Sequence, residues 1–312
     1  QTAGHAIATG ACAAADAATL GQVDDLRRAR DDQARRVHHA AQNVEAGWAR
    51  LTNQKEPWYN QGPSDMGAWM GQIPNDRLVS DMFIPGTHDS GAMHGGDLAE
   101  CQAWSIEAQL RAGIRCFDVR LRQTGDALAV HHGVVFQHAF FPQIAHDFED
   151  FLWRNPSEVI LVSITGNGCQ HDSRRRFGEH VLSQIPTPAR WAKLGQDLGS
   201  TPLRKLRGCI VAIGCEFNDT EVEAQNDWQL GDAEQKWGRV WRHARMAREK
   251  GVVYMNYLSA TGSDGMGYIT PAGLAYQVNR RAYDCMQKFK PSIVMMDYPG
   301  MGLVERIIHR NF

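Results

Sequence analysis

Side chains that can hold or transfer protons follow directly after a short, largely apolar segment near residue 85. The run 81–84 and the Pro-Gly break after it predict a buried strand that ends in a turn. Beyond the turn come Thr87, His88, Asp89 and Ser90. Polar groups at the end of a buried strand are typical of active sites in α/β proteins, and an imidazole next to a carboxylate suits general acid and base catalysis. A His-Asp pair alone is more typical of a surface turn, so this prediction depends on further residues.

A second group of such residues occurs in the apolar segment 114–120. Asp118 and Arg120 are two positions apart, so on a strand they share one face. An arginine that points into a protein is costly unless it meets anions, and a guanidinium group is well matched to a phosphate. The sequence therefore favours a phosphate site at this strand, with a purely structural Asp118–Arg120 ion pair as the alternative.

His132 follows a third apolar segment, at residues 127–131. His88 and His132, one on each side of Arg120, would supply a general base and a general acid around one phosphate. Asp89 and Asp297 are candidates to hold these imidazoles by hydrogen bonds. The sequence alone does not say which carboxylate serves which histidine.

The elements that must position these side chains are mostly continuous apolar runs, separated in several places by helical stretches. Continuous runs are typical of parallel strands covered on both faces. Seven or eight such units suit a closed barrel, whose mouth gathers the strand ends, and no Gly-x-Gly-x-x-Gly turn supports a doubly wound sheet. We predict a TIM-type (β/α) barrel, regular or irregular, with strands at 81–84, 114–120, 127–131, 158–164, 209–214, 251–257 and 292–297.

The first 60 residues are expected to form a helical extension and linker, and residues 61–312 the catalytic barrel. Between residues 14 and 51 apolar side chains recur at steps of three and four, which predicts an amphipathic helix. The segment 52–65 is rich in turn-forming residues and is expected to be the linker. All candidate site residues lie beyond this segment.

Composition excludes some classes of protein. The net charge of −2 and the isoelectric point near 6.7 give no basic face for nucleic acid. No apolar run approaches the roughly 18 residues needed to span a bilayer. The seven cysteines have no paired metal-ligand spacing. The chain begins at Gln1, as a secreted protein does once its signal peptide is removed and as a truncated chain also would. We expect a secreted monomer.

Four blocks of sequence, in this order, resemble the bacterial phosphatidylinositol-specific phospholipases C of the metal-independent type. They are IPGTHDSG at 84–91, GIRCFDVR at 113–120, HHG at 131–133 and NPSEVILVSI at 155–164. The resemblance runs from about residue 69 to the C-terminus. It implies the barrel fold and an enzyme that cleaves phosphatidylinositol, and its glycosylated anchors as a further candidate substrate, to diacylglycerol and inositol 1,2-cyclic phosphate.

The resemblance also implies roles for individual residues. His88, oriented by Asp297, would deprotonate the inositol 2-hydroxyl, and His132, supported by Asp89, would protonate the departing diacylglycerol oxygen. Arg120 would stabilise the phosphate. The inositol phosphate headgroup would be bound by Asp118, Asp227, Trp228 and Tyr257. The enzyme would touch a membrane surface peripherally.

No metal or other cofactor is expected. Relatives that use Ca²⁺ hold it where this chain has Arg120, and an arginine cannot ligate a cation. The sequence departs from the family where the sugar is held. A lysine of the family falls near Thr165 or Gly166 here, and an arginine near Cys215 or Glu216. Headgroup preference is therefore less firmly implied than the type of reaction.

Two alternatives remain open at this point. One is a barrel phosphodiesterase of the glycerophosphodiesterase or sphingomyelinase D type, which would have a His-Arg-Gly motif and acidic metal ligands. The other is a non-catalytic protein that binds inositol lipids, which would have no need of the proton-transfer pair His88 and His132.

Overall fold

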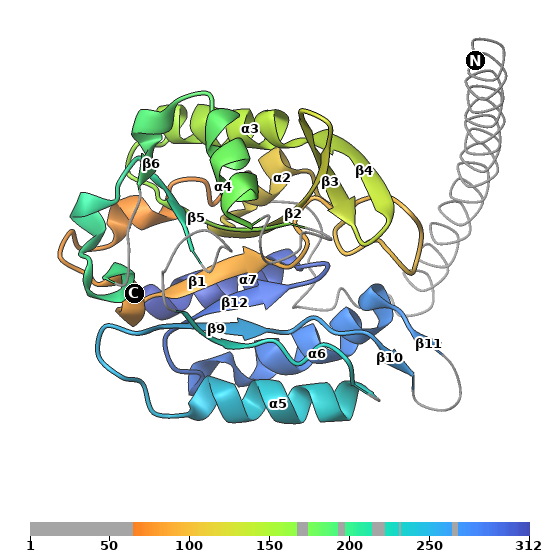
Figure 1. The fold of residues 1–312 in the computed structure, drawn as a ribbon. Helices are drawn as coiled ribbons and strands as arrows, with labels where there is room; N and C mark the ends of the chain where they lie inside the picture. The colour runs from red at the N-terminus through yellow and green to blue at the C-terminus, as the bar shows by residue number, and fades with distance from the viewer. Residues whose placement is uncertain (1–64, 167–173, 193–196, 214–221, 231, 264–267) are drawn as a thin grey trace, which may run out of the picture. The chain divides into compact units, whose positions relative to one another are not determined.

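The computed structural model describes residues 65–166, 174–192, 197–213, 222–230, 232–263 and 268–312. The expected helical extension and linker at residues 1–60 lie outside the described residues. Helices and strands alternate along most of the described chain. Figure 1 shows the strands between α3 (Phe141–Arg154) and α4 (Arg174–Ser183) on one side, and α5 (Ala233–Arg245) and α6 (Pro271–Cys285) on the other.

The main sheet is a parallel one. Its strands run in the spatial order β6-β7-β5-β2-β1-β12-β9-β8. All of these neighbours pair in parallel, and among the described residues no pairing joins β6 to β8. The strands span β1 (Phe83–Thr87), β2 (Cys116–Thr124), β5 (Ile160–Gly166), β6 (Trp191–Ala192), β7 (Ile210–Ala212), β8 (Val222–Gln225), β9 (Val253–Tyr257) and β12 (Ser292–Met296).

The remaining elements lie outside this parallel order. The additional strands are β3 (Ala127–His132), β4 (Val135–Phe140), β10 (Gly262–Ser263) and β11 (Tyr268–Ile269), and the additional helices are α2 (Ile106–Ala112) and α7 (Met301–Ile308). Helix α2 begins where the Ser105 side chain accepts a hydrogen bond from the Ala108 N–H, and it ends at Gly113, whose φ of 101° is readily adopted only by glycine. Single 3-10 turns lie at Trp69–Gln72, Val79–Asp81, Pro188–Arg190, Leu198–Ser200, Leu203–Lys205, Met286–Lys288 and His309–Asn311.

The segment 127–131 was expected to be one of the parallel barrel strands, and this expectation is wrong. Strand β2 continues past Arg120 to Thr124, and β3 pairs with it in the antiparallel direction. Only two residues connect β2 to β3, whereas a parallel connection needs a crossover of about a dozen residues. The strands β2, β3 and β4 therefore form a meander that extends the sheet.

A buried ion pair closes the end of the sheet where the parallel strands begin. Arg115 precedes β2 and Glu158 precedes β5, and the Arg115 Nη2 donates to Glu158 Oε2 at 2.8 Å with both side chains 0% exposed. The same guanidinium group donates to the Gly67 carbonyl, and the Glu158 carboxylate accepts from the Met70 N–H. Because both ions have further hydrogen-bond partners, this cluster is structural.

Candidate active site

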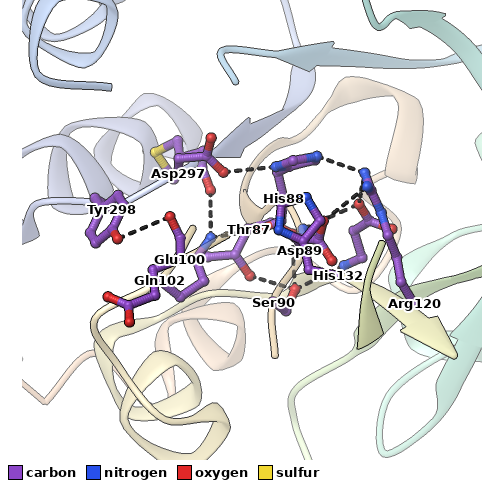
Figure 2. A network of polar contacts seen from close by, with 12 residues as sticks. Thr87, His88, Asp89, Ser90, Glu100, Gln102, Arg120, His132, Asp297 and Tyr298 are labelled. Carbon is purple, nitrogen blue, oxygen red and sulfur yellow. Dashed lines mark hydrogen bonds and ion pairs between the residues drawn. The ribbon is translucent and has the colours of Figure 1, made fainter. Parts of the chain in front are cut away.

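The turn after β1 is fixed by a hydroxyl network (Figure 2). Thr87 Oγ1 lies 2.8 Å from Ser90 Oγ, and Ser90 Oγ accepts a hydrogen bond from the Asp118 N–H at 2.9 Å. Between them, Asp89 has a φ of 44°, which is uncommon outside glycine, and its N–H donates to Asp118 Oδ2 at 3.2 Å. These contacts hold the backbone in a turn that directs His88 and Asp89 toward Asp118 and Arg120 of β2.

His88 is held on both ring nitrogens. Its Nδ1 lies 2.8 Å from Asp297 Oδ1, and its Nε2 lies 2.6 Å from Arg120 Nη2. Arginine can only donate, so Nε2 carries the lone pair and Nδ1 carries the proton that is donated to Asp297. Burial lowers the pKa of His88 and Arg120 also lowers it, but Asp297 and Asp89 outweigh both, and the pKa is raised. The structure thus shows the imidazole in the tautomer that a general base requires.

Arg120 connects three side chains. Its Nη1 lies 2.9 Å from Asp89 Oδ2 and its Nη2 lies 3.1 Å from Asp118 Oδ2. Burial alone would lower the pKa of Arg120, but these two carboxylates hold it well above its ordinary value. In turn, Arg120 and His88 outweigh burial at Asp118 and lower its pKa. The guanidinium is therefore permanently charged and lies against the base.

His132 lies on the other side of Asp89. Its Nε2 is 3.5 Å from Asp89 Oδ2, and its Nδ1 donates to the Ala99 carbonyl at 2.7 Å. With Nδ1 already protonated, a second proton on Nε2 makes an imidazolium that faces a carboxylate. His132 is thus arranged to carry a transferable proton on Nε2.

The cluster is open to a ligand. The side chains of His88, Arg120 and His132 are 13%, 27% and 21% exposed. The Tyr257 ring lies edge-on to His88, with 5.9 Å between the ring centroids, and forms a buried wall beside the base. Because burial weighs against the phenolate, the pKa of Tyr257 is raised well above its usual range, and this side chain stays neutral.

Two of the expected site residues do not join the cluster. Asp227 and Trp228 follow the C-terminal end of β8, and Trp228 is 52% exposed. The nearest cation to the Asp227 carboxylate among the ion pairs of the described residues is Arg239, with Nε 3.7 Å from Oδ2. None of the contacts found for these two residues in the described chain reaches His88 or Arg120.

Sequence reasoning missed three residues around the site. Gln102 Nε2 donates to the His88 carbonyl at 2.6 Å and to the Met296 carbonyl at 3.0 Å, which ties the turns after β1 and β12 together. Lys236 on α5 is fully buried, and its Nζ donates to Gln225 Oε1 at 3.1 Å and to the Asp227 carbonyl at 2.9 Å. A single lysine on the apolar face of an amphipathic helix was the signal that could have revealed it.

The third missed residue is Cys101. Its thiol belongs to a group with His88 and Asp89 whose potential ligand atoms all lie within 4.8 Å of one another. Burial raises the pKa of this thiol well above its usual range. A cation placed here would also meet the guanidinium group of Arg120, which lies against His88. These residues are therefore poorly suited to holding a metal ion.

Residues 76–186 match the family model described as phosphatidylinositol-specific phospholipase C, X domain. A 1-phosphatidylinositol phosphodiesterase of Listeria monocytogenes is 23% identical over 292 residues, which cover 84% of this chain and 89% of that protein. A protein of the same name from Staphylococcus aureus is 31% identical over 127 residues, which cover 39% of this chain and 38% of that protein.

Solved structures agree with the fold. The phosphatidylinositol-specific phospholipase C of Listeria monocytogenes superposes with a TM-score of 0.69 at 23% identity, covering 80% of this chain and 99% of that one. A Staphylococcus aureus phosphatidylinositol-specific phospholipase C mutant gives a TM-score of 0.67 at 19% identity, covering 78% of this chain and 97% of that one. The expected barrel-type α/β fold is confirmed.

Over residues 76–186 the chain is similar to the X domain of phosphatidylinositol-specific phospholipase C, and its fold is similar to that of the bacterial enzymes of that name.

Proposed function

We propose that the chain cleaves phosphatidylinositol to diacylglycerol and inositol 1,2-cyclic phosphate. The observation that carries the proposal is the arrangement of two histidines about one arginine. His88 Nδ1 is hydrogen-bonded to Asp297 Oδ1 at 2.8 Å, so its Nε2 carries a lone pair. His132 Nε2 lies 3.5 Å from Asp89 Oδ2, on the other side of that carboxylate. A base, an acid and a fixed cation are what an internal displacement at phosphorus needs.

In the proposed reaction His88 Nε2 removes the proton from the inositol 2-hydroxyl. The electron pair of that oxygen forms a bond to phosphorus, and the bond from phosphorus to the glycerol oxygen breaks. The His132 imidazolium gives its Nε2 proton to the glycerol oxygen, so diacylglycerol leaves neutral. For this, the Arg120 guanidinium turns from His88 Nε2, now 2.6 Å away, to a phosphate oxygen. Catalysis by Arg120, and not by a metal ion, is part of the proposal.

The headgroup would lie among Asp118, Tyr257 and the turn that carries Asp227 and Trp228. Tyr257 and Asp118 already border the cluster, and the exposed Trp228 ring offers a flat surface for a sugar ring. The glycosylated anchors of the lipid are a further candidate substrate, since the exposed position of Trp228 leaves room beyond the inositol.

We further infer a secreted, monomeric enzyme that meets the membrane peripherally, with residues 1–60 as an accessory to the catalytic barrel. No helix within the described ranges is long and apolar enough to cross a membrane. The experiment that tests the function is ³¹P NMR of a reaction with phosphatidylinositol in detergent micelles. Inositol 1,2-cyclic phosphate as the first product supports the proposal. Phosphatidic acid, a glycerophosphodiester or no turnover at all would contradict it.

A further inference from the structure

The ladder of backbone hydrogen bonds between β1 and β12 ends at the base. The His88 N–H donates to the Met296 carbonyl at 3.0 Å, and in a regular parallel ladder the next bond would run from the Tyr298 N–H to the His88 carbonyl. The chain turns away instead, because Tyr298 has a φ of 42° and its N–H donates to the Cys101 carbonyl at 2.9 Å. Strand pairing therefore leaves the His88 carbonyl without its regular partner.

The side chain of Gln102 takes the place of the missing bond. Its Nε2 donates to the His88 carbonyl at 2.6 Å and to the Met296 carbonyl at 3.0 Å (Figure 2). Both partners are acceptors, so the amide nitrogen has to face them. The two carbonyls belong to the peptide bonds that lead into Asp89 and Asp297. One amide thus joins the backbone of the base to that of its orienting carboxylate.

Gln102 makes these two bonds at the expense of its amide oxygen. The residue is only 2% exposed, and its Oε1 has no hydrogen-bond partner among the described residues. A buried acceptor without a partner lowers stability, and departures of this kind are expected at functional sites. The amide is therefore placed for what its nitrogen does at the two carbonyls.

The segment 99–102, which carries this amide, is itself fixed. The Gln102 N–H donates to the Ala92 carbonyl at 3.0 Å. At the other end of the segment, the Ala99 carbonyl accepts the hydrogen bond from His132 Nδ1 at 2.7 Å. Four consecutive residues thus reach from the proposed acid to the proposed base, and their backbone contacts restrict the movement of the amide.

We propose that Gln102 is a positioning residue of the reaction, whose amide holds the His88 imidazole on Asp297 in the geometry that removes the substrate proton. This inference rests on the proposed function. The base must meet the 2-hydroxyl in a set direction, and a displacement of about 1 Å can cost on the order of 10²-fold in rate. Because the amide is buried and bonded to the backbone, its loss should act on the chemical step and spare substrate binding.

The test is the variant Gln102→Met, which keeps the length of the side chain and removes the donor. On phosphatidylinositol in detergent micelles, kcat should fall about 10²-fold with KM little changed. The second readout is the downfield ¹H NMR resonance of the His88 Nδ1 proton, identified by its loss in His88→Ala. This resonance should move upfield in Gln102→Met, because the charge-assisted bond to Asp297 lengthens.

The matched control is Asn311→Leu, which acts at the other end of the same strand. The buried Asn311 amide also holds backbone: its Nδ2 donates to the carbonyl of Phe83, the first residue of β1, at 2.8 Å, and its Oδ1 accepts from the Phe83 N–H at 2.9 Å. Loss of either amide should lower the free energy of unfolding in urea. Only the loss of Gln102 should change kcat and the His88 resonance.

A lower kcat with a shifted resonance in Gln102→Met, and neither change in Asn311→Leu, would support the proposal. An unchanged kcat or an unchanged resonance in Gln102→Met would overturn it, as would equal changes in Asn311→Leu. Should Gln102→Met not fold, the same measurements on Gln102→Asn decide, since this side chain keeps the amide but is too short to reach both carbonyls. Absence of turnover by the unaltered chain would reject the proposed reaction, and the resonance would then decide whether the amide holds His88 on Asp297.

Discussion

The His88 Nδ1 and the Asp297 Oδ1 lie 2.8 Å apart although 209 positions separate them in the chain. Their meeting follows from strand register. Thr87 of β1 pairs with Met296 of β12, and the His88 N–H continues the ladder by donating to the Met296 carbonyl at 3.0 Å. His88 and Asp297 are the next residue on each strand, so the register that builds the sheet also builds the dyad. A slip of one residue would separate them.

Asp297→Asn should shift the acid limb of the pH profile of kcat/KM to lower pH. Burial lowers the pKa of His88, and Asp297 is the main group that raises it. Without this carboxylate the pKa falls, and the neutral base persists to lower pH. At the plateau kcat/KM should fall on the order of 10²–10⁴-fold, because the tautomer of the base is no longer fixed. The control is Asp284→Asn, at an exposed position of α6. A limb that stays in place or moves to higher pH would refute the role of Asp297.

Arg120→Ala should lower kcat by at least 10²–10³-fold, as is typical when a group that stabilises developing charge is lost. Arg120→Lys keeps the charge but lacks the planar fork, so it should recover only part of the loss. Activity of the unaltered chain should survive an excess of EDTA. Complete inhibition by EDTA with recovery on adding Ca²⁺ would show that a metal ion does the work assigned to Arg120.

Lys236→Met should change how stability depends on pH. Burial lowers the pKa of Lys236 to about 7, from a usual value of 10.5. Between these values the unfolded chain binds more protons at this group, so its contribution to the free energy of unfolding rises with pH and is least favourable below about pH 7. Methionine removes this dependence. The free energy of unfolding of Lys236→Met, taken relative to that of the unaltered chain, should therefore be higher at pH 6 than at pH 9.

Urea unfolding of both proteins at pH 6 and pH 9 measures this difference, and the pH dependence of all other groups cancels in the comparison. The lost hydrogen bonds to Gln225 and Asp227 lower stability at both pH values alike. An equal difference at the two values would mean that Lys236 titrates as an exposed lysine does.

Much of the fold was predictable because buried parallel strands are continuous apolar runs. The runs at 81–84, 114–120 and 292–297 correspond to β1, β2 and β12, and their C-terminal ends carry His88, Arg120 and Asp297. The direction of β3 was not read correctly, since apolar periodicity does not give strand direction. The two-residue connection before β3 contained that information, because it allows only an antiparallel neighbour.

The supporting residues were harder to predict. Gln102 and Lys236 act through hydrogen bonds to backbone carbonyls, which any polar side chain could make, so their residue types alone do not mark them.

The central claim is that His88 acts as the base and His132 as the acid, and the choice of leaving group tests it most directly. Diacylglycerol leaves as an alkoxide of high pKa and needs protonation, whereas p-nitrophenolate leaves readily without an acid. His132→Ala should therefore be impaired about 10²–10⁴-fold on phosphatidylinositol and much less on inositol p-nitrophenyl phosphate. His88→Ala should be severely impaired on both, because the 2-hydroxyl must lose its proton in either reaction. Equal impairment of His132→Ala on the two substrates would contradict the assignment of the acid, and the opposite pattern would exchange the two histidines.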